Sequence, residues 1–308
     1  MFQGAEHADV LHRPFQPDIN LPIQHWRTLA KRLVVTVQDI IAYRIGVYHQ
    51  SGASWLNYRK HFQETLAQID GIVAISKDVE RSISEEKFRV SSDRTFMVEN
   101  GTDHLLGGGA ELMPSAFAER GWAAAPFVVM IGTDYAHKNR DLAIKVWHEL
   151  RRRDWPVRLV LAGVTVPYGA SRTEEALLGI HQDDDVLVLP GVTSPERNWL
   201  LAHADLVLYP TSAEGFGLVP FEAAHLGTPT LSVSFGPLRE VGAIYEGMPE
   251  TWDVMRLADA GAALLADPAH AAATVRLMMT KGSALTWKRM ADRLVESYFQ
   301  LLTKPSLR

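Results

Sequence analysis

Two glutamates eight residues apart, Glu214 and Glu222, are the residues of this chain whose type and spacing most clearly suit chemistry. Between them lie Gly215, Phe216 and Gly217, so a glycine-flanked aromatic separates the two carboxylates. A carboxylate can accept hydrogen bonds from both hydroxyls of a vicinal diol. The glycines let a ligand approach their backbone N–H groups closely, because they have no side chain. The pattern indicates a ligand that is rich in hydroxyl groups, such as a ribose or a hexose, and that carries an anion.

Each glutamate also has an ordinary structural interpretation. Glu222 would favour the first turns of a helix, where the helix dipole stabilises a negative charge, and Glu214 would be a surface loop residue. The surroundings favour the functional interpretation, because the apolar run 205–210 precedes the motif and the segment 223–229 ends in Gly-Thr-Pro. That order predicts a strand, a loop, a helix and a further strand. In a parallel α/β sheet such a loop lies at the carboxyl end of a strand, where these folds bind ligands.

The segment 132–140 has a similar arrangement. A predicted strand ends at Gly132, a loop follows, and a helix begins near Asn139, which is a good N-cap residue. Lys138 stands just before the positive end of the helix dipole, a place that disfavours a cation by a few tenths to about 1 kcal/mol. A phosphate bound between Lys138 and the helix would reverse the sign of that effect. The alternative is a solvated lysine in a surface loop.

Composition restricts the classes of protein to which the chain can belong. Its 308 residues suffice for about two domains, and its net charge of −5 gives no overall attraction to nucleic acid. The absence of cysteine excludes disulfides and thiolate metal sites, and it fits a reducing cytosol. Residues 1–14 lack the apolar core of a signal peptide, and no run approaches the roughly 18 apolar residues of a spanning helix. We therefore expect a cytoplasmic protein whose contact with a membrane would be peripheral.

Short apolar runs alternate with amphipathic segments along the chain, which is typical of an α/β fold with parallel sheets. The predicted strands are 9–12, 33–37, 71–75, 94–98, 127–132, 157–162, 186–189, 206–209 and 230–233. The predicted helices are 55–69, 76–84, 139–152, 173–180, 195–202 and 284–302. Residues 106–125 differ in character, because they hold three consecutive glycines and Pro114, and they predict a linker.

The motifs together resemble the retaining glycosyltransferases of the GT-B fold, in the large group known as family 4, the glycosyl transferases group 1. The resemblance rests on His137-Lys138-Asn139 after Gly132, on the Glu-x7-Glu spacing of Glu214 and Glu222, and on the Gly-Thr-Pro at 227–229. It covers nearly the whole chain from about Asp9. Further matching segments are 36–40, 74–76, 100–103 and 286–287.

The resemblance implies a role for each matching position. Lys138, assisted by His137, would bind the donor diphosphate, and Glu222 would hold the nucleotide ribose. Glu214 would hold the donor sugar with the backbone of Gly215 to Gly217. The implied donor-binding residues are Gly132, His137, Lys138, Asn139, Glu214, Gly215, Phe216, Gly217, Leu218 and Glu222. The implied catalytic residues are Lys138, Glu214 and Asp39.

The resemblance also implies the reaction. Such enzymes transfer a sugar from a nucleotide diphosphate with retention of configuration. They need no cofactor and no bound metal, because basic side chains and helix dipoles offset the charge of the leaving group. The His-Lys-Asn loop is similar to that of polysaccharide-assembly mannosyltransferases, which implies a hexosyl donor such as a mannosyl nucleotide. The acceptor would then be a growing glycan or a lipid-linked sugar.

A GT-B enzyme has two Rossmann-like domains that face a cleft. The resemblance therefore implies a partial acceptor-side domain over residues 1–105 and a nucleotide-sugar-binding domain over 126–285. A C-terminal helix over 286–308 would pack back toward the first domain. Residues 1–105 match only the later half of the family's N-terminal domain, so its first strands are expected to be missing from this chain.

A second departure from the family is Gln38, since relatives usually have histidine before the aspartate that corresponds to Asp39. Glutamine can hydrogen-bond a sugar hydroxyl but cannot carry a proton. Two other functions therefore stay open. The chain could be a non-catalytic sugar-nucleotide-binding subunit that a partner chain completes. It could also be another GT-B enzyme, such as a sugar-nucleotide epimerase or a phosphorylase.

Overall fold

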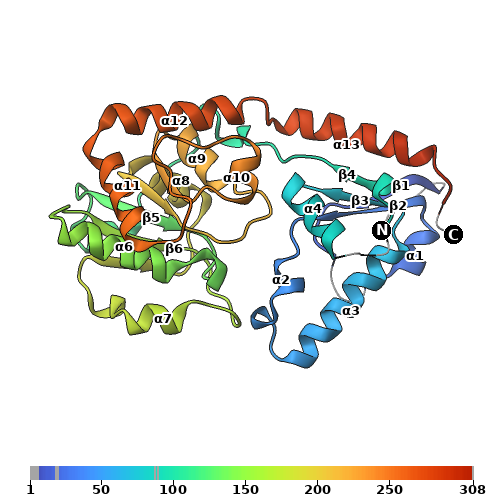
Figure 1. Cartoon of the computed structure of the whole chain (residues 1–308), viewed down its shortest axis with the longest axis horizontal. Coiled ribbons are helices and arrows are strands. Elements are labelled where there is room, and N and C mark those ends of the chain that lie inside the picture. The colour runs from blue at the N-terminus through green and yellow to red at the C-terminus, as the bar shows by residue number, and fades with distance from the viewer. Residues whose placement is uncertain (1–6, 18–20, 87, 89, 307–308) are drawn as a thin grey trace. The chain divides into compact units, whose positions relative to one another are not determined.

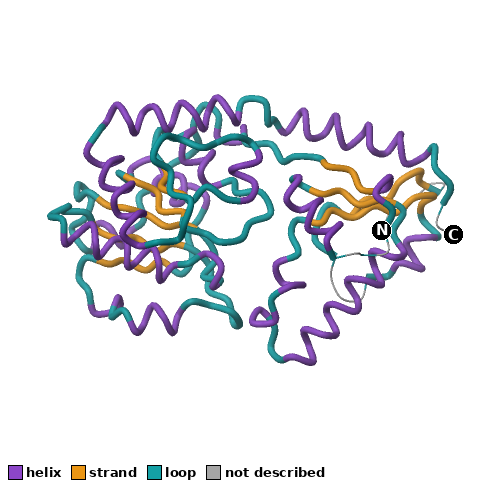
Figure 2. The backbone as a smooth tube through the Cα atoms, viewed as in Figure 1, coloured by secondary structure: helices purple, strands orange, loops and turns teal. Residues whose placement is uncertain are grey.

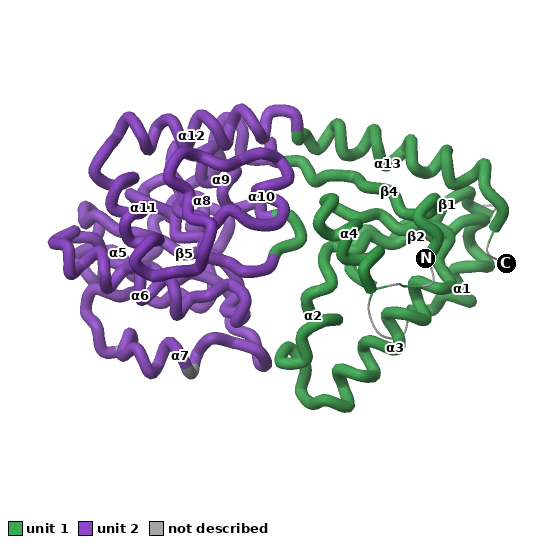
Figure 3. Tube along the Cα trace, viewed as in Figure 1, with its two compact units in different colours: residues 1–101, 214–216, 285–308 green, residues 102–213, 217–284 purple. Residues whose placement is uncertain are grey.

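The computed structural model describes residues 7–17, 21–86, 88 and 90–306. The chain divides into two compact units, which Figure 3 distinguishes by colour. Unit 1 comprises the described residues of 1–101, 214–216 and 285–308, and unit 2 comprises residues 102–213 and 217–284. Each unit is built around its own parallel sheet (Figures 1 and 2).

The sheet of unit 1 has the strand order β1-β2-β3-β4, with every neighbouring pair parallel. Its strands are β1 (Ala8–Arg13), β2 (Ala30–Val37), β3 (Gly71–Ala74) and β4 (Thr95–Met97). Its α-helices are α1 (Ile23–Arg27), α2 (Ile41–Arg44), α3 (Gly52–Gln68), α4 (Lys77–Glu85) and α13 (Trp287–Leu302), and its 3-10 turns are η1 (Gly46–Tyr48) and η2 (Ser92–Arg94).

Both faces of this sheet are covered by helices. Figure 1 shows α13 along one side of the sheet and α3 on the other. The α13 side buries Leu301 in a cluster with Val34 of β2, Val73 of β3 and Val98, which directly follows β4. Thr286 caps this helix by accepting a hydrogen bond from the backbone of Arg289. Because residues 33–37 of β2 and all of β3 are buried on both faces, these stretches are almost continuously apolar, as expected for parallel strands.

A partly buried polar contact links β1, β2 and α13. His12 is hydrogen-bonded through Nδ1 to the hydroxyl of Tyr298 at 2.6 Å and through Nε2 to the hydroxyl of Thr36 at 2.9 Å. Burial lowers the pKa of His12 to about 4 from its ordinary value of 6.5. The folded unit therefore holds a neutral imidazole under conditions in which the unfolded chain would bind a proton.

Acid should destabilise unit 1 through this histidine. Between pH 6.5 and 4 the unfolded state binds more protons than the folded state, so the free energy of unfolding falls as the pH is lowered. At about 1.36 kcal/mol per pKa unit, the loss between pH 7 and pH 4.5 should be roughly 2 to 3 kcal/mol. Denaturant unfolding at the two pH values measures it. A His12→Gln variant should show a pH dependence smaller by that amount, and an equal dependence in both proteins would contradict the assignment.

The sheet of unit 2 is also fully parallel and has the order β7-β6-β5-β8-β9. Its strands are β5 (Phe127–Ile131), β6 (Arg158–Ala162), β7 (Val186–Leu189), β8 (Leu206–Tyr209) and β9 (Thr230–Ser232). Its α-helices are α5 (Ser115–Glu119), α6 (Arg140–Arg152), α7 (Arg172–Leu177), α8 (Ser194–His203), α9 (Val219–His225), α10 (Gly236–Glu240), α11 (Val254–Ala266) and α12 (Pro268–Gly282). Its 3-10 turns are η3 (Asp103–Leu105), η4 (Ala136–Lys138) and η5 (Ile180–Gln182).

Every residue of β5 is buried, because helices cover both faces of the central strands. On one face, Val129 and Val207 pack with residues of α5, α8 and α9. The other face carries α6 and α11, which contact each other. Gly261 lets α11 approach closely, since a Cβ there would lie 3.2 Å from the side chain of Leu231. The predicted α/β fold class with parallel sheets is thus confirmed.

The segment 106–125, predicted as a linker, is part of unit 2. It contains α5, and its aromatic residues Phe117 and Trp122 are buried in the main hydrophobic cluster of that unit. Trp199 of α8 also packs against this cluster, and its ring lies 4.9 Å from that of Phe117. Two large aromatic side chains gain more by burial than the glycines lose in conformational entropy, so the segment folds onto the sheet.

No described helix is both long enough and apolar enough to cross a membrane.

Candidate functional site

Two loops leave neighbouring strands of unit 2 at the place where the direction of winding reverses. The chain passes from β5 to β6 and β7 on one side, and then returns to β8 and β9 on the other. The loop 132–139 follows β5, and the loop 210–218 follows β8. The crevice outside the carboxyl ends of two such strands is where open α/β sheets bind ligands. Both motifs that the sequence singles out therefore begin at this switch point.

Hydrogen bonds join the two loops. The backbone N–H of Ser212 donates to the carbonyl oxygen of His137 at 2.8 Å, and the hydroxyl of Thr211 donates to the same oxygen at 3.1 Å. The side-chain amide of Asn139 donates to the carbonyl oxygen of Pro210 at 2.8 Å. The residues on both sides of Lys138 are therefore attached to the end of β8.

Asn139 stands at the N-cap position of α6, as predicted, but its side chain does not cap the helix. Its backbone is left-handed, with φ 57°, a conformation that asparagine adopts more readily than most residues. Its amide group bonds the β8 loop instead. Lys138 ends the preceding 3-10 turn η4, so the cation stands at the junction of two helical segments.

The side chain of Lys138 extends over Gly132. A Cβ added to Gly132 would lie 3.9 Å from both Cδ and Cε of Lys138. Gly132 has φ 148°, outside the range that residues with side chains readily adopt. The aliphatic part of the lysine thus rests on the backbone at the carboxyl end of β5.

Glu222 lies on α9 and is only 5 % exposed. One carboxylate oxygen is 2.8 Å from Nε2 of His104, and the other accepts a hydrogen bond from the guanidinium of Arg197. Both partners are themselves partly exposed. Sequence reasoning missed His104 and Arg197. His104 directly follows the matched segment 100–103, but nothing in the sequence signals that α8 would bring Arg197 to the same carboxylate.

His225 stands one turn after Glu222 on the same helix. Burial, reinforced by the neighbouring His104, lowers the pKa of His225. Its buried Nδ1 has no hydrogen-bond partner among the residues that the structure describes. The lowered pKa favours the neutral form of His225.

Gly217, which lies two residues before α9 in the Glu214–Glu222 motif, has φ 87°, where glycine is favoured. A Cβ there would lie 3.3 Å from the hydroxyl of Tyr209. Leu218 follows as the N-cap residue of α9. Of the predicted site residues, unit 2 thus holds Gly132, His137, Lys138, Asn139, Gly217, Leu218 and Glu222.

The other predicted residues belong to unit 1, because Glu214, Gly215 and Phe216 are grouped with it. The hydroxyl of Ser76 donates to the carbonyl oxygen of Gly215 at 2.7 Å. A Cβ at Gly215 would overlap the carbonyl oxygen of Gln38. The glycine is therefore required by a close approach to the ends of β2 and β3, and it places the Glu214 segment beside Gln38.

Asp39 has a local structural role. Its Oδ1 accepts a hydrogen bond of 2.8 Å from the backbone of Ile41, which starts α2. Gln16 holds the adjoining backbone, since its side chain accepts from Gln38 N at 2.8 Å and donates to Asp39 O at 2.6 Å. The side chain of Gln38 is exposed. The polar residues after β2 are thus fixed in place at the carboxyl edge of this sheet.

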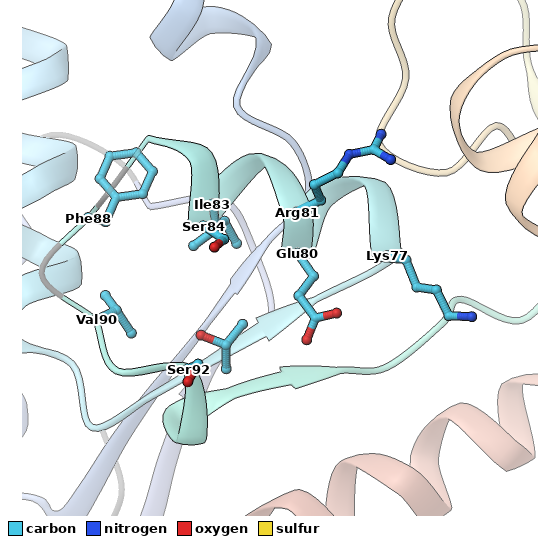
Figure 4. A pocket seen from close by; sticks show the side chains of 9 residues that line it. Lys77, Glu80, Arg81, Ile83, Ser84, Phe88, Val90 and Ser92 are labelled. Atoms are coloured by element: carbon cyan, nitrogen blue, oxygen red, sulfur yellow. The ribbon is translucent and has the colours of Figure 1, made fainter.

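A cavity of about 500 Å³ lies in unit 1 between α4 and β4, away from these residues (Figure 4). Its lining includes Lys77, Glu80, Arg81 and Phe88, and none of the predicted site residues lines it. In Figure 4 the carboxylate of Glu80 reaches from the helix toward the strand, whereas Arg81 points away from it. Arg81 is paired with Asp78 on its own helix. In the described part of the chain, no group of three or more His, Asp or Glu residues could hold a metal ion.

Known proteins resemble this chain in fold. Sucrose-phosphate synthase from Thermosynechococcus elongatus superimposes with a TM-score of 0.67 at 21 % identity, over 91 % of this chain and 70 % of that one. The Anabaena protein Alr3699/HepE, solved in complex with UDP and glucose, gives a TM-score of 0.67 at 18 % identity, over 89 % of this chain and 74 % of that one. These likenesses confirm the predicted GT-B type of fold.

Sequence comparison gives the family. The D-inositol 3-phosphate glycosyltransferase of Pseudarthrobacter chlorophenolicus is 32 % identical over 238 residues, which cover 75 % of this chain and 51 % of that protein. This chain spans about half the length of the curated relatives that it matches over most of its own length. The sequence profile of the family described as "Glycosyl transferases group 1" matches residues 116–276, more than half of the chain. The chain belongs to the family Glycosyl transferases group 1.

Proposed function

We propose that the chain acts in transferring a hexosyl group, such as mannosyl, from a nucleotide-diphosphate sugar to a glycan or lipid-linked acceptor. Transfer would proceed with retention of configuration and without a bound metal or cofactor. The observation that carries the proposal is the attachment of the Lys138 loop to the end of β8 at the switch point of unit 2. This attachment holds a lysine at the edge where such sheets bind ligands.

In this proposal Lys138 binds the diphosphate and offsets the charge that develops on the leaving group. Glu222 accepts hydrogen bonds from the ribose hydroxyls. A carboxylate has about four lone-pair positions, so bonds to His104 and Arg197 leave it capacity for a diol. The contacts with His104 and Arg197 hold the carboxylate of Glu222 in one orientation. The complex of HepE with UDP and glucose supports a donor of this class.

The remaining roles are those that the resemblance to the family implies. Glu214 and the backbone from Gly215 onward hold the donor sugar, and Asp39 assists at the reacting carbon. The names of the sequence relatives suggest that a phosphorylated polyol is one acceptor to test beside glycans.

The alternative is a subunit that binds a sugar nucleotide without turning it over and needs a partner chain. The contacts after β2 favour it, because Oδ1 of Asp39 already accepts from Ile41 and Gln38 cannot transfer a proton. An epimerase, which would return an isomerised donor, is the other alternative.

Turnover by the purified chain separates these functions. The chain is incubated with GDP-mannose, UDP-glucose or ADP-glucose, with and without inositol phosphate or an oligosaccharide, and the products are identified by NMR. Release of the nucleoside diphosphate with a transferred sugar of unchanged anomeric configuration is the expected result. Nucleotide binding without turnover of any donor would favour the subunit. An isomerised donor without transfer would favour the epimerase.

Replacing Glu222 by alanine tests the ribose contact. Loss of a charged hydrogen-bonded contact should weaken binding of the nucleoside diphosphate by about 1 to 3 kcal/mol in titration calorimetry. Glu246→Ala, which removes an exposed carboxylate elsewhere in unit 2, serves as the control and should leave the affinity unchanged. If Glu222→Ala also left it unchanged while the variant stayed folded, Glu222 would not be a ligand of the nucleotide.

A further inference from the structure

Arg140, the first residue of α6, is a buried cation that the proposed function does not yet use. Its side chain is 2 % exposed, and it stands at the positive end of the helix dipole. Both conditions disfavour a positive charge. Burial indeed lowers the pKa of Arg140, against the opposing influence of Glu175 and Asp134. Specific contacts must offset the free-energy cost of burying this charge. The contacts of Arg140 therefore indicate its role.

The guanidinium holds the backbone of the phosphate loop. Nη2 of Arg140 donates to the carbonyl oxygen of Gly132 at 2.8 Å. The same oxygen lies against Gly163, where an added Cβ would overlap it. Gly163 has φ 146°, so glycine is required there by conformation as well as by space. The carbonyl of Gly132 is thus confined from two sides, by the loop after β6 and by the first residue of α6.

Two buried acidic residues, Asp134 and Glu175, lie near the guanidinium of Arg140. Asp134 is 0 % exposed, and its Oδ1 accepts a hydrogen bond of 2.8 Å from Val166 N. Glu175 of α7 is 2 % exposed, and its carboxylate lies 3.9 Å from Nη1 of Arg140. The backbone N–H of Ser171 also donates to the carbonyl oxygen of Asp134 at 2.9 Å. The cation and the two acids therefore join the loop after β5 to the loop and helix after β6.

This network is not arranged for stability alone. Among the described residues, Nε of Arg140 and Oδ2 of Asp134 have no hydrogen-bond partner, and the nearest charge to Oδ2 is the half-exposed Arg172, whose Nε lies 3.7 Å away. Incompletely satisfied buried charges are often less stabilising than an apolar replacement of the same volume. The hydrogen bond that Arg140 makes is the one to Gly132. A Cβ built on Gly132 would lie 3.9 Å from Cδ and Cε of Lys138, so the aliphatic part of the lysine runs beside the backbone of Gly132.

We infer that Arg140 is a positioning residue for Lys138: its guanidinium fixes the Gly132 carbonyl, and thereby the backbone on which the phosphate-binding lysine rests. The inference rests on the proposed function, since it assigns Arg140 to the diphosphate side of the same site. It predicts that Arg140 affects binding of the phosphates and leaves binding of the nucleoside alone unaffected.

The variant Arg140→Lys tests the positioning role. Lysine keeps the positive charge, but it lacks the planar guanidinium that hydrogen-bonds Gly132 and faces Glu175 at the same time. Calorimetry compares GDP, UDP and ADP with guanosine, uridine and adenosine. We expect the diphosphate that binds the native chain to bind about 10-fold more weakly, with the affinity for its nucleoside unchanged. Arg152→Lys is the matched control, as Arg152 is an exposed arginine on the same helix, and it should change neither affinity.

A double-mutant cycle with Lys138→Met separates positioning from general destabilisation. If Arg140 acts through Lys138, Arg140→Lys should weaken diphosphate binding no further once Lys138 is methionine. Additive losses, an equal loss for the nucleoside, or no loss at all would overturn the inference. Should Arg140→Lys fail to fold, Arg140→Gln combined with Glu175→Gln removes one charge of each sign, and the same selective loss is expected.

The outcomes also distinguish this inference from the proposed function. If Lys138→Met by itself leaves diphosphate affinity unchanged, or if none of the three diphosphates binds, the proposed site fails and the inference fails with it. If Lys138→Met weakens binding but Arg140→Lys does not, the proposed site stands and only the role of Arg140 is refuted.

Discussion

Replacing Phe117 by alanine should lower the free energy of unfolding of unit 2 by about 3 to 5 kcal/mol, the usual loss for a fully buried phenylalanine. Its side chain is 0 % exposed. Its ring makes edge contacts with those of Trp122, Phe127 and Trp199 at centroid distances of 6.0, 5.1 and 4.9 Å. Removing it would leave a cavity among large rings that cannot collapse into the space.

Denaturant unfolding followed by tryptophan fluorescence measures this loss, since Trp122 and Trp199 line the cavity that the substitution creates. Leu112→Ala is the control, because Leu112 lies in the same segment and its side chain is exposed. It should change the free energy of unfolding by less than about 0.5 kcal/mol. A loss below about 1 kcal/mol for Phe117→Ala would mean that 106–125 is a linker after all.

In the segment 106–125 the composition predicts a linker, whereas the segment packs as part of unit 2. Three glycines and Pro114 predict an irregular chain, and the part around Gly107 and Gly108 does have left-handed glycines. The burial of Phe117 and Trp122 depends on a pocket between α8 and the sheet, which forms only in the folded unit. A local pattern can indicate the turns in such a segment, but not the surface on which its aromatic residues pack.

The strands were predictable because parallel strands buried on both faces become continuous apolar runs, as in 127–131. The helices α11 and α12 were not predicted, although their start signals are present. Asp253 accepts from the backbone of Arg256, and Asp267 caps α12 just before Pro268. The small residues of α11 hid its periodicity, because alanine and glycine contribute little to an apolar face.

Some residues of the candidate site could likewise be predicted from the sequence, and others could not. The Lys138 loop could be predicted because the strand end, the loop and the helix start are consecutive in sequence. The partners of Glu222 could not, since His104 and Arg197 come from distant segments whose meeting depends on the tertiary fold. No signal in the sequence marks Arg140 as internal, and only its burial near Asp134 and Glu175 in the structure does so.

Replacing Lys138 by methionine should reduce the rate of sugar transfer about 10²- to 10³-fold, the usual effect of removing one preorganised charge from the place where charge develops. Methionine preserves the length and the apolar contact over Gly132 but has no ammonium group. The expected change lies mainly in kcat, because negative charge on the leaving diphosphate grows as the glycosidic bond breaks. Steady-state kinetics with the donor that the native chain uses measures it.

Lys145→Met is the matched control, because Lys145 lies on α6, the helix that follows Lys138, and is half exposed, paired with Asp141 at 2.9 Å. It should leave kcat and KM unchanged, which would show that loss of one positive charge from this part of unit 2 is not itself the cause of the slower transfer. A rise in KM with unchanged kcat for Lys138→Met would mean that the lysine binds the donor equally in ground and transition states. Rates equal to those of the native chain would remove Lys138 from the site. The lysine would then be a solvated loop residue, and the β5–β8 switch point would have to bind its ligand through backbone groups alone.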